Sequence, residues 1–248
     1  MLENAKRAKL EIRRRIWERL EREGVARPPG ASGRIPNFVG AEEAADRLAS
    51  LEPWRAAQTI MANPDTAQLP VRAKALTQGK LLYMAVPGLT NPLPFLRLDP
   101  TRLGVSSWQA ASSKGALAIA PKVAVSEMDP IDLVISGNVA VNREGARIGK
   151  GAGFSDIEVA MLVDAGLIGE STKFATTVHP LQVIDEPLPE TDHDFRLDVI
   201  VTPDEVIWCS SPRRPSGLIM DHLDEEKVAA VPALAAFIGN RNDANAPH

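Results

Sequence analysis

The sequence predicts a single α/β domain in which helices flank a largely parallel sheet. Short apolar runs of strand type alternate along the chain with amphipathic runs of helix type, and this alternation is typical of a parallel sheet. With 248 residues, 44% of them hydrophobic, the chain can bury the core of one large domain or of two small ones. We place one domain over residues 1–240 and a polar tail over 241–248.

The N-terminal region begins with a predicted helix over residues 3–22. Its apolar residues Ile12, Ile16 and Leu20 are four apart and therefore share one face, while charged residues occupy the other faces. Glycine and proline in "RPPGASGRIPNF" (27–38) then predict a long connection.

A strand–helix–strand unit follows a second predicted helix over 40–51. The apolar runs at 57–64 and 80–87 each end in proline and are interpreted as buried strands. The segment 70–79 between them has a helical pattern, and residues 88–130 are assigned to no element.

The second half of the chain continues the alternation. "IDLVIS" (131–136) is apolar and β-branched, as expected of a buried strand, and "SDIEVAMLVDAG" (155–166) predicts a helix. Ser155 and Glu158 have the spacing of a capping box, and Gly166 is a suitable stop. Further strands are predicted at 173–180, 196–203 and 205–211, with a helix at 224–239.

Composition excludes several classes of protein. The net charge of −4 gives no general attraction for nucleic acid or for an anionic membrane. The sequence has no run of about 18 apolar residues, and its charged N-terminus lacks a signal-peptide pattern. Cys209 is the only cysteine, so it cannot form a disulfide within the chain. We expect a cytoplasmic protein without nucleic-acid or membrane partners; its oligomeric state is left open.

The stretch "EGARIGKGAGFSD" (144–156) is rich in glycine and precedes a predicted helix. Free N–H groups at a helix start favour phosphate, and glycine lets it approach the backbone. The spacing within 149–153 is not that of a dinucleotide fold, and Lys150 is not followed by the Ser or Thr of a P-loop. Spacing alone favours a structural turn and a phosphate site equally. Only a phosphate site would make Asp156 a candidate magnesium ligand, because a cation would have to separate the two anions.

Four segments carry motifs that occur together in one known family. "DLVISGNVAVNREGARIGKGAGFSD" is similar to a strand followed by Pro-Gly-Val-Ala-Phe and Gly-x-Arg-Leu-Gly-x-Gly-x-Gly-Tyr-Tyr-Asp. "AKLEIR" is similar to a basic helix, "NPDT" to a Glu-Thr substrate segment, and "LPETDHDFRLDVIVTP" to a His-Asp-x-x-Val-Asp strand. In this order they resemble the motifs of the 5-formyltetrahydrofolate cyclo-ligases, also called methenyltetrahydrofolate synthetases.

The resemblance implies a sugar-phosphate isomerase and CoA-transferase-like α/β fold. It also implies an enzyme that uses ATP and Mg²⁺ to phosphorylate the formyl oxygen of 5-formyltetrahydrofolate. A second folate nitrogen then attacks the activated carbon, and phosphate leaves as 5,10-methenyltetrahydrofolate forms. Phosphoryl transfer depends mainly on positioning and charge neutralisation, so lysines, arginines and a metal are expected.

The resemblance assigns phosphate binding to a basic pair and to the glycine-rich loop. Lys9 and Arg13, which share one face of the first helix, match the family's basic pair, and Arg13 is also matched to the substrate. Without the match, a solvated basic face is the simpler interpretation. Arg147 and Lys150 are the implied catalytic cations. The implied cofactor-binding set is Lys9, Arg13, Arg147, Gly149, Lys150, Gly151 and Gly153.

Two aspartates match the family's acidic magnesium positions, Asp156 and Asp198. Asp198 lies in an otherwise apolar strand, where a carboxylate is unfavourable unless it is paired or bound to metal; the alternative is an edge position facing solvent. His193 and Asp194 match a His-Asp pair, for which we expect a structural role or an indirect one behind the site's contact residues, not a catalytic one.

For the substrate, Asp65 stands where the family has a glutamate, and Phe154 stands where it has the first of two tyrosines. "NPDT" is also an ordinary turn sequence. Ser155 replaces the second tyrosine, so the phosphate cradle is better preserved than the pterin pocket. Three tryptophans are candidates for stacking on a pterin, although burial in the core is the usual state of this residue: Trp54, Trp108 and Trp208.

Three hypotheses about function follow. The first is the folate cyclo-ligase. The second is a cyclo-ligase-like paralogue that binds ATP or another phosphorylated small molecule, including one of thiamine metabolism. "RIPNF", "AQT" and "NPD" in the N-terminal half resemble such paralogues. The third is a non-catalytic nucleotide- or folate-binding protein.

Overall fold

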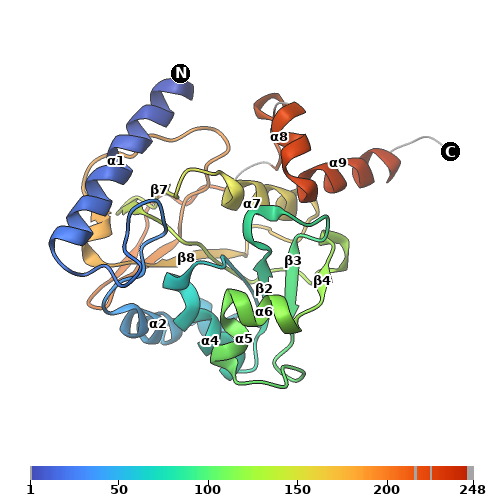
Figure 1. Cartoon of the computed structure of the whole chain (residues 1–248), viewed down its shortest axis with the longest axis horizontal. Helices are drawn as coiled ribbons and strands as arrows, with labels where there is room; N and C mark the ends of the chain where they lie inside the picture. Colours follow the sequence, from blue (N-terminus) through green and yellow to red (C-terminus); the bar gives the residue numbers. More distant parts are fainter. Residues whose placement is uncertain (1, 215–216, 224, 245–248) are drawn as a thin grey trace.

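A computed structural model describes residues 2–214, 217–223 and 225–244. Its centre is an eight-stranded sheet (Figure 1). From one edge to the other, the strands are β11 (Val206–Trp208), β10 (Val199–Val201), β8 (Lys173–Thr177), β5 (Leu133–Ile135), β1 (Thr59–Ala62), β2 (Leu81–Ala85), β3 (Phe95–Leu98) and β4 (Lys122–Val123). The strands from β10 to β2 are parallel, while β11, β3 and β4 pair antiparallel at the two edges. The predicted α/β class with a largely parallel sheet is confirmed.

The central strands are buried on both faces, as parallel strands are when helices cover the sheet. Ile60 of β1 pairs with Leu82 on one side and with Leu133 on the other. This register aligns the carboxyl ends of β1 and β5, and both strands are followed there by polar residues. The parallel pairing therefore decides where polar groups gather.

Helices cover both faces of the sheet (Figure 1). One layer contains α2 (Ala41–Ala49), α3 (Glu52–Ala56), α4 (Leu69–Thr77), α5 (Ser107–Ala111) and α6 (Ser113–Ile119), whose apolar residues share a core with β1 and β2. The other contains α7 (Phe154–Asp164), α8 (Glu225–Ala230) and α9 (Pro232–Ala244). Short 3-10 turns are η1 (Thr66–Gln68), η2 (Pro87–Leu89), η3 (Val125–Glu127), η4 (Pro180–Gln182) and η5 (Met220–His222).

The first helix, α1 (Leu2–Arg22), packs beside a second, smaller sheet. This sheet consists of β7 (Arg147–Ile148), β6 (Ala140–Asn142) and β9 (Val183–Ile184). Ile16 and Leu20 are fully buried against it, so the apolar stripe of the predicted helix is its packing face. Within the part of the chain that the structure describes, no helix has the length and apolar character needed to cross a membrane.

The structure differs from the expected element order in three places. The unassigned segment 88–130 holds β3, α5, α6 and β4, with Ser106 and Ser112 as side-chain caps of the two helices. A hairpin of β6 and β7, to which the sequence analysis assigned no strands, lies between β5 and the glycines of the loop. The predicted C-terminal helix is divided at Pro232, and α9 continues to Ala244. The first four residues of the predicted tail are thus helical, and residues 245–248 lie outside the described chain.

The predicted capping box at the start of α7 is wrong. The helix begins at Phe154, and its N-cap is Gly153, which has a left-handed backbone with φ of 73° and no side chain to cap with. Ser155 and Glu158 instead direct their side chains to Asn63 at the end of β1. The predicted stop at Gly166 is confirmed, with φ of 71° just after the helix.

Arg72 of α4 binds the backbone just after β1. Its side chain is 1% exposed. The guanidinium donates to the carbonyl oxygens of Asn63 (2.5 Å), Pro64 (3.3 Å), Asp65 (2.9 Å) and Ala111 (2.9 Å). Burial lowers the pKa of Arg72 to about 10, so the group stays charged at neutral pH. Arg72 thus fixes the chain where it leaves the sheet.

Arg72→Met should lower the free energy of unfolding by about 3 kcal/mol or more, because several buried carbonyl groups lose their donors. Urea titrations of the variant and the wild type measure this difference. Arg102→Met is the matched control, since the Arg102 side chain is 85% exposed, and it should stay within about 0.5 kcal/mol. An Arg72 variant as stable as the control would contradict the assigned role.

Candidate functional site

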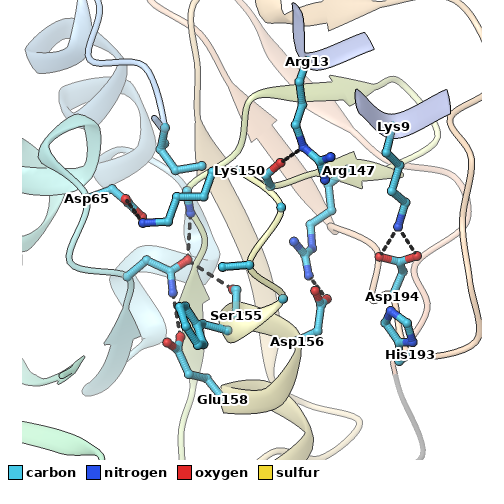
Figure 2. A pocket seen from close by; sticks show the side chains of 18 of the residues that line it. Lys9, Arg13, Asp65, Arg147, Lys150, Ser155, Asp156, Glu158, His193 and Asp194 are labelled. Carbon is cyan, nitrogen blue, oxygen red and sulfur yellow. Dashed lines mark hydrogen bonds and ion pairs between the residues drawn. The ribbon is translucent and has the colours of Figure 1, made fainter. Parts of the chain in front are cut away.

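A cavity of about 630 Å³ opens beside the carboxyl ends of β1 and β5. Its wall is formed by α1, by the segments that follow these two strands, by the glycine-rich loop and by the start of α7 (Figure 2). Ligands of parallel α/β sheets characteristically bind at this edge.

Asn63 joins three parts of the wall. Its Oδ1 accepts hydrogen bonds from the Gly137 N–H (2.9 Å), just after β5, and from the Ser155 hydroxyl (3.2 Å). Because two donors face Oδ1, the amide nitrogen must face the other way, where it donates to Glu158 Oε2 at 2.8 Å. Asn63 and Glu158 line the cavity, and the sequence analysis had given neither a role in binding. For Glu158 the sequence did contain an indication, because it is an acidic residue within the otherwise apolar helix predicted at 155–166.

Basic residues gather on the side of the cavity near α1. Lys9 Nζ contacts both carboxylate oxygens of Asp194, at 2.8 and 2.6 Å. Arg13 Nε donates to the Gly149 carbonyl oxygen at 2.7 Å, which connects α1 to the glycine-rich loop. The predicted pair, Lys9 and Arg13, therefore faces the cavity and not open solvent.

The glycine-rich loop needs glycine at two positions. Gly151 and Gly153 have φ of 115° and 73°, a region that other residues rarely adopt. A β-carbon on Gly151 would also lie 3.4 Å from the Arg13 guanidinium carbon. The loop thus lets α1, the loop backbone and the N-terminus of α7 approach one another closely.

Arg147 lies beneath this loop, with its side chain 3% exposed. Its guanidinium stacks on the Phe195 ring, 3.5 Å from the centroid, and forms an ion pair with Asp156. Within the described chain, its Nε has no hydrogen-bond partner. Burial raises the pKa of Asp156, although Arg147 opposes that shift.

On the opposite side, Lys150 reaches across the cavity to Asp65, with Nζ 3.8 Å from Oδ1 (Figure 2). Burial raises the pKa of Asp65, and the positive charge of Lys150 partly offsets this. The Asp65 carboxylate lies against Gly137, where a β-carbon would come within 2.8 Å of Oδ2. Phe154 also lines the cavity.

Glu158 is a further buried acid of this site with a raised pKa. It is 3% exposed, and burial together with the charges of Asp65 and Asp156 raises its pKa to about 8. Its carboxyl group is therefore mostly protonated at neutral pH, so it can donate a hydrogen bond as well as accept one.

Asp198 is not placed in the cavity, which corrects the expected pairing with Asp156. Its carboxylate accepts a hydrogen bond from the Phe174 N–H (2.6 Å) and pairs with Arg214 (2.5 Å); the residue lies just before β10, at the amino end of that strand, and does not line the cavity. The Asp198 carboxylate is thus stabilised by protein partners.

Asp194 is a further aspartate on the cavity wall. Burial alone would raise the pKa of Asp194, but Lys9 and Thr191 outweigh that effect and lower it.

His193, for which we expected a structural role, also lines the cavity together with His222 of η5. The three candidate tryptophans do not line the cavity: Trp54 is buried in the core, while Trp108 and Trp208 are 51% and 56% exposed.

In the described residues, no group of three or more His, Cys, Asp or Glu side chains forms a ready metal site. The cavity therefore combines cations and carboxylates that neutralise one another in pairs.

The titration of Glu158 gives stability a defined pH dependence. The unfolded chain releases this proton near pH 4.5, and the folded chain holds it to about pH 8. Between these values the folded state binds more protons, so rising pH should weaken the metal-free protein by up to about 1.4 kcal/mol per pH unit. Below pH 4.5 Glu158 is protonated in both states, and its full contribution to stability is present. Above about pH 8 that contribution is lost.

Glu158→Gln should remove this slope, because glutamine does not titrate and can still accept from Asn63. Urea unfolding at several pH values between 4.5 and 8 measures it. Glu170→Gln, at an exposed position, should keep the wild-type slope. An unchanged slope in Glu158→Gln would show that this carboxyl group does not titrate in the window.

The chain is similar to known proteins of one family. The sequence profile of the 5-formyltetrahydrofolate cyclo-ligase family matches residues 5–203. Methenyltetrahydrofolate synthase domain-containing proteins of Mus musculus and Bos taurus are 36% and 35% identical over 235 and 238 residues, which is 92% and 93% of this chain. The chain spans 62% of the length of these relatives.

A solved NMR structure, that of Aquifex aeolicus 5,10-methenyltetrahydrofolate synthetase, is similar in fold. The TM-score is 0.51 at 22% identity, and the alignment covers 83% of this chain and 94% of that one. The profile match over most of the sequence shows that the chain belongs to the 5-formyltetrahydrofolate cyclo-ligase family of ligase-like enzymes.

Proposed function

We propose that this protein converts 5-formyltetrahydrofolate into 5,10-methenyltetrahydrofolate with ATP and Mg²⁺. The observation that carries the proposal is the convergence of Lys9, Arg13 and Lys150 on the glycine-rich loop, within one cavity. Family membership supports the reaction class. The chemistry requires charge neutralisation around a transferred phosphoryl group, which these side chains provide.

The phosphate side of the site is the glycine-rich loop with the basic face of α1. The loop ends at the N-terminus of α7, an eleven-residue helix whose first N–H groups are not used within the helix. Arg13 is already oriented by the Gly149 carbonyl group, so its remaining N–H groups are available to an anion in the cavity. We assign ATP phosphates to Arg13, Lys9, Lys150 and the backbone of residues 149–153.

The donor set suits a magnesium ion that arrives with the nucleotide. Mg²⁺ prefers one or two carboxylates together with phosphate oxygens and water. Asp156 and Asp194 provide carboxylates on the cavity wall, and their charges affect each other. In this proposal Asp156 is the main protein ligand, and Arg147 keeps it oriented from behind. The ion would supply additional charge neutralisation between the phosphates.

The substrate side is the region of Asp65, Phe154 and Asn63. Phe154 offers an apolar face, while Asp65 accepts hydrogen bonds from a nitrogen-rich ring. The chain's part in the reaction is to hold the formyl oxygen against the phosphate side, to exclude water and to keep the attacking nitrogen near the activated carbon. Lys150 and Arg147 are the cations nearest to this meeting point.

A second candidate keeps the site but changes the substrate. Apart from histidine, Phe154 is the aromatic residue among the described cavity-lining side chains, and the Ser155 hydroxyl is turned towards Asn63. The family's two tyrosines are thus represented by a single ring. This observation favours a paralogue that retains phosphate binding and acts on a different small heterocycle, including one of thiamine metabolism.

The proposed reaction can be tested by a direct assay of turnover. Purified protein supplied with 5-formyltetrahydrofolate, ATP and Mg²⁺ should form methenyltetrahydrofolate, which is followed by its absorbance. Product formation should require both ATP and Mg²⁺, because the cations of the site serve a phosphoryl transfer. The controls omit one component at a time.

The absence of product at high enzyme concentration would overturn the cyclo-ligase assignment. Thermal stabilisation by Mg–ATP but not by 5-formyltetrahydrofolate would then favour the paralogue with another substrate.

The two aspartates that the sequence paired should behave differently. Asp156→Asn should lower kcat/KM by about 100-fold or more and weaken Mg²⁺ dependence, because it removes a charge from the cavity wall. Asp198→Asn should keep the wild-type Mg²⁺ dependence and lose about 1–3 kcal/mol of stability through its weakened contact with Arg214. Mg²⁺ titrations of activity and urea unfolding distinguish the two. Equal loss of Mg²⁺ dependence in both would contradict the assignment.

A further inference from the structure

The cavity contains three cation–carboxylate pairs that differ in how firmly they are held. Lys9 and Asp194 are 12% and 7% exposed, and Asp194 also accepts from Thr191. Arg147 is 3% exposed and stacked on a ring. These two pairs are fixed parts of the wall.

The third pair, Lys150 with Asp65, is different. The Lys150 side chain is 46% exposed, and its 3.8 Å distance to Asp65 is too long for a hydrogen bond. Lys150 lies between Gly149 and Gly151, in a loop that bends through glycines. Because Lys150 is partly exposed and its contact with Asp65 is longer than a hydrogen bond, the contact holds Lys150 only weakly, and a stronger anion can draw this side chain away.

Asp65 cannot follow Lys150. The carbonyl oxygen of Asp65 is held by Arg72, and its carboxylate lies against Gly137. The side chain is only 19% exposed, so the carboxylate depends on a nearby donor or cation. A second acceptor, the fully buried Gln68 Oε1, lies on the same side of Gly137 and has no partner within the described chain.

We propose that Lys150 couples the two halves of the cavity: it is paired with Asp65 when the cavity is empty and moves to the phosphates when nucleotide binds, which exposes Asp65 to the second substrate. The inference rests on the proposed nucleotide binding at this loop. Without nucleotide, the second substrate must displace Lys150 itself. With nucleotide bound, it meets a carboxylate that lacks a partner and that can accept its N–H groups.

This coupling makes each ligand strengthen the binding of the other. By thermodynamic reciprocity, nucleotide and second substrate must raise each other's affinity by the same factor. Lys150 is partly exposed, so we expect a factor at the lower end of the usual range, about five-fold. The fixed pairs at Lys9 and Arg147 contribute nothing to this factor, because they do not exchange partners with the Asp65 side.

The first experiment observes Asp65 directly and needs no second substrate. The protein is labelled with ¹³C-aspartate, and Asp65→Asn identifies the Asp65 carboxyl signal. Its pKa is measured with and without Mg²⁺ and the non-hydrolysable analogue adenylyl imidodiphosphate. We expect the analogue to raise the pKa of Asp65, because Lys150 leaves. In Lys150→Met that pKa should already be raised and should not respond to the analogue.

The second experiment measures the coupling factor by calorimetric titration of 5-formyltetrahydrofolate with and without the same analogue. The wild type should show the five-fold increase, and Asp65→Asn and Lys150→Met should reduce the factor to about one. As a ratio, the factor is unaffected by a uniform loss of affinity in a variant. Lys122→Met, at the exposed start of β4, is the matched control and should retain the wild-type factor.

The outcomes separate this inference from the proposed function. Analogue binding without a change at Asp65 overturns the coupling and leaves the cyclo-ligase proposal standing. A rise in the pKa of Asp65 without turnover or folate binding supports the coupling and overturns the folate assignment. Failure of the analogue to bind overturns both.

Discussion

Arg72 lies enclosed beneath the cavity and donates its hydrogens to the carbonyl groups of the segment that leaves β1. That segment carries Asn63 and Asp65, so the position of the cavity wall follows from this one guanidinium. Above it, Asn63 connects the ends of β1 and β5 to the start of α7. The buried Arg72 guanidinium therefore fixes the backbone that carries two polar residues of the site. Its N–H groups have few other acceptors within reach, so this backbone has few alternative conformations.

The second constraint is electrostatic. The chain is acidic overall, yet it concentrates lysine and arginine around the glycine-rich loop. Three of these cations meet a carboxylate of the cavity: Lys9 meets Asp194, Arg147 meets Asp156 and Lys150 meets Asp65. Such pairing keeps charge within a partly buried cavity at a tolerable desolvation cost. The three pairs together add little net charge of either sign to the cavity.

The part of the cavity that we propose for the substrate is where this chain departs from the family motif. Phe154 and Ser155 occupy the tyrosine positions, and the Ser155 hydroxyl serves the wall through Asn63. Glu158, with its raised pKa, adds a mostly protonated carboxyl group to that side. The phosphate half retains its glycines and its basic pair.

The sequence by itself determined the α/β class, most strands and helices, and the basic face of α1, because these depend on local periodicity and on short motifs. It also indicated Asp156 and the glycine-rich loop. It placed Asp198 incorrectly: an aspartate in an apolar strand requires a partner, but only the fold shows that this partner is Arg214. Asn63, Glu158 and Asp194 gain their roles from contacts between residues far apart in the chain, such as Lys9 with Asp194 and Asn63 with Glu158. The tertiary structure decided these roles, since the parallel register brings the ends of distant strands together and burial then fixes the charge and orientation of each polar group.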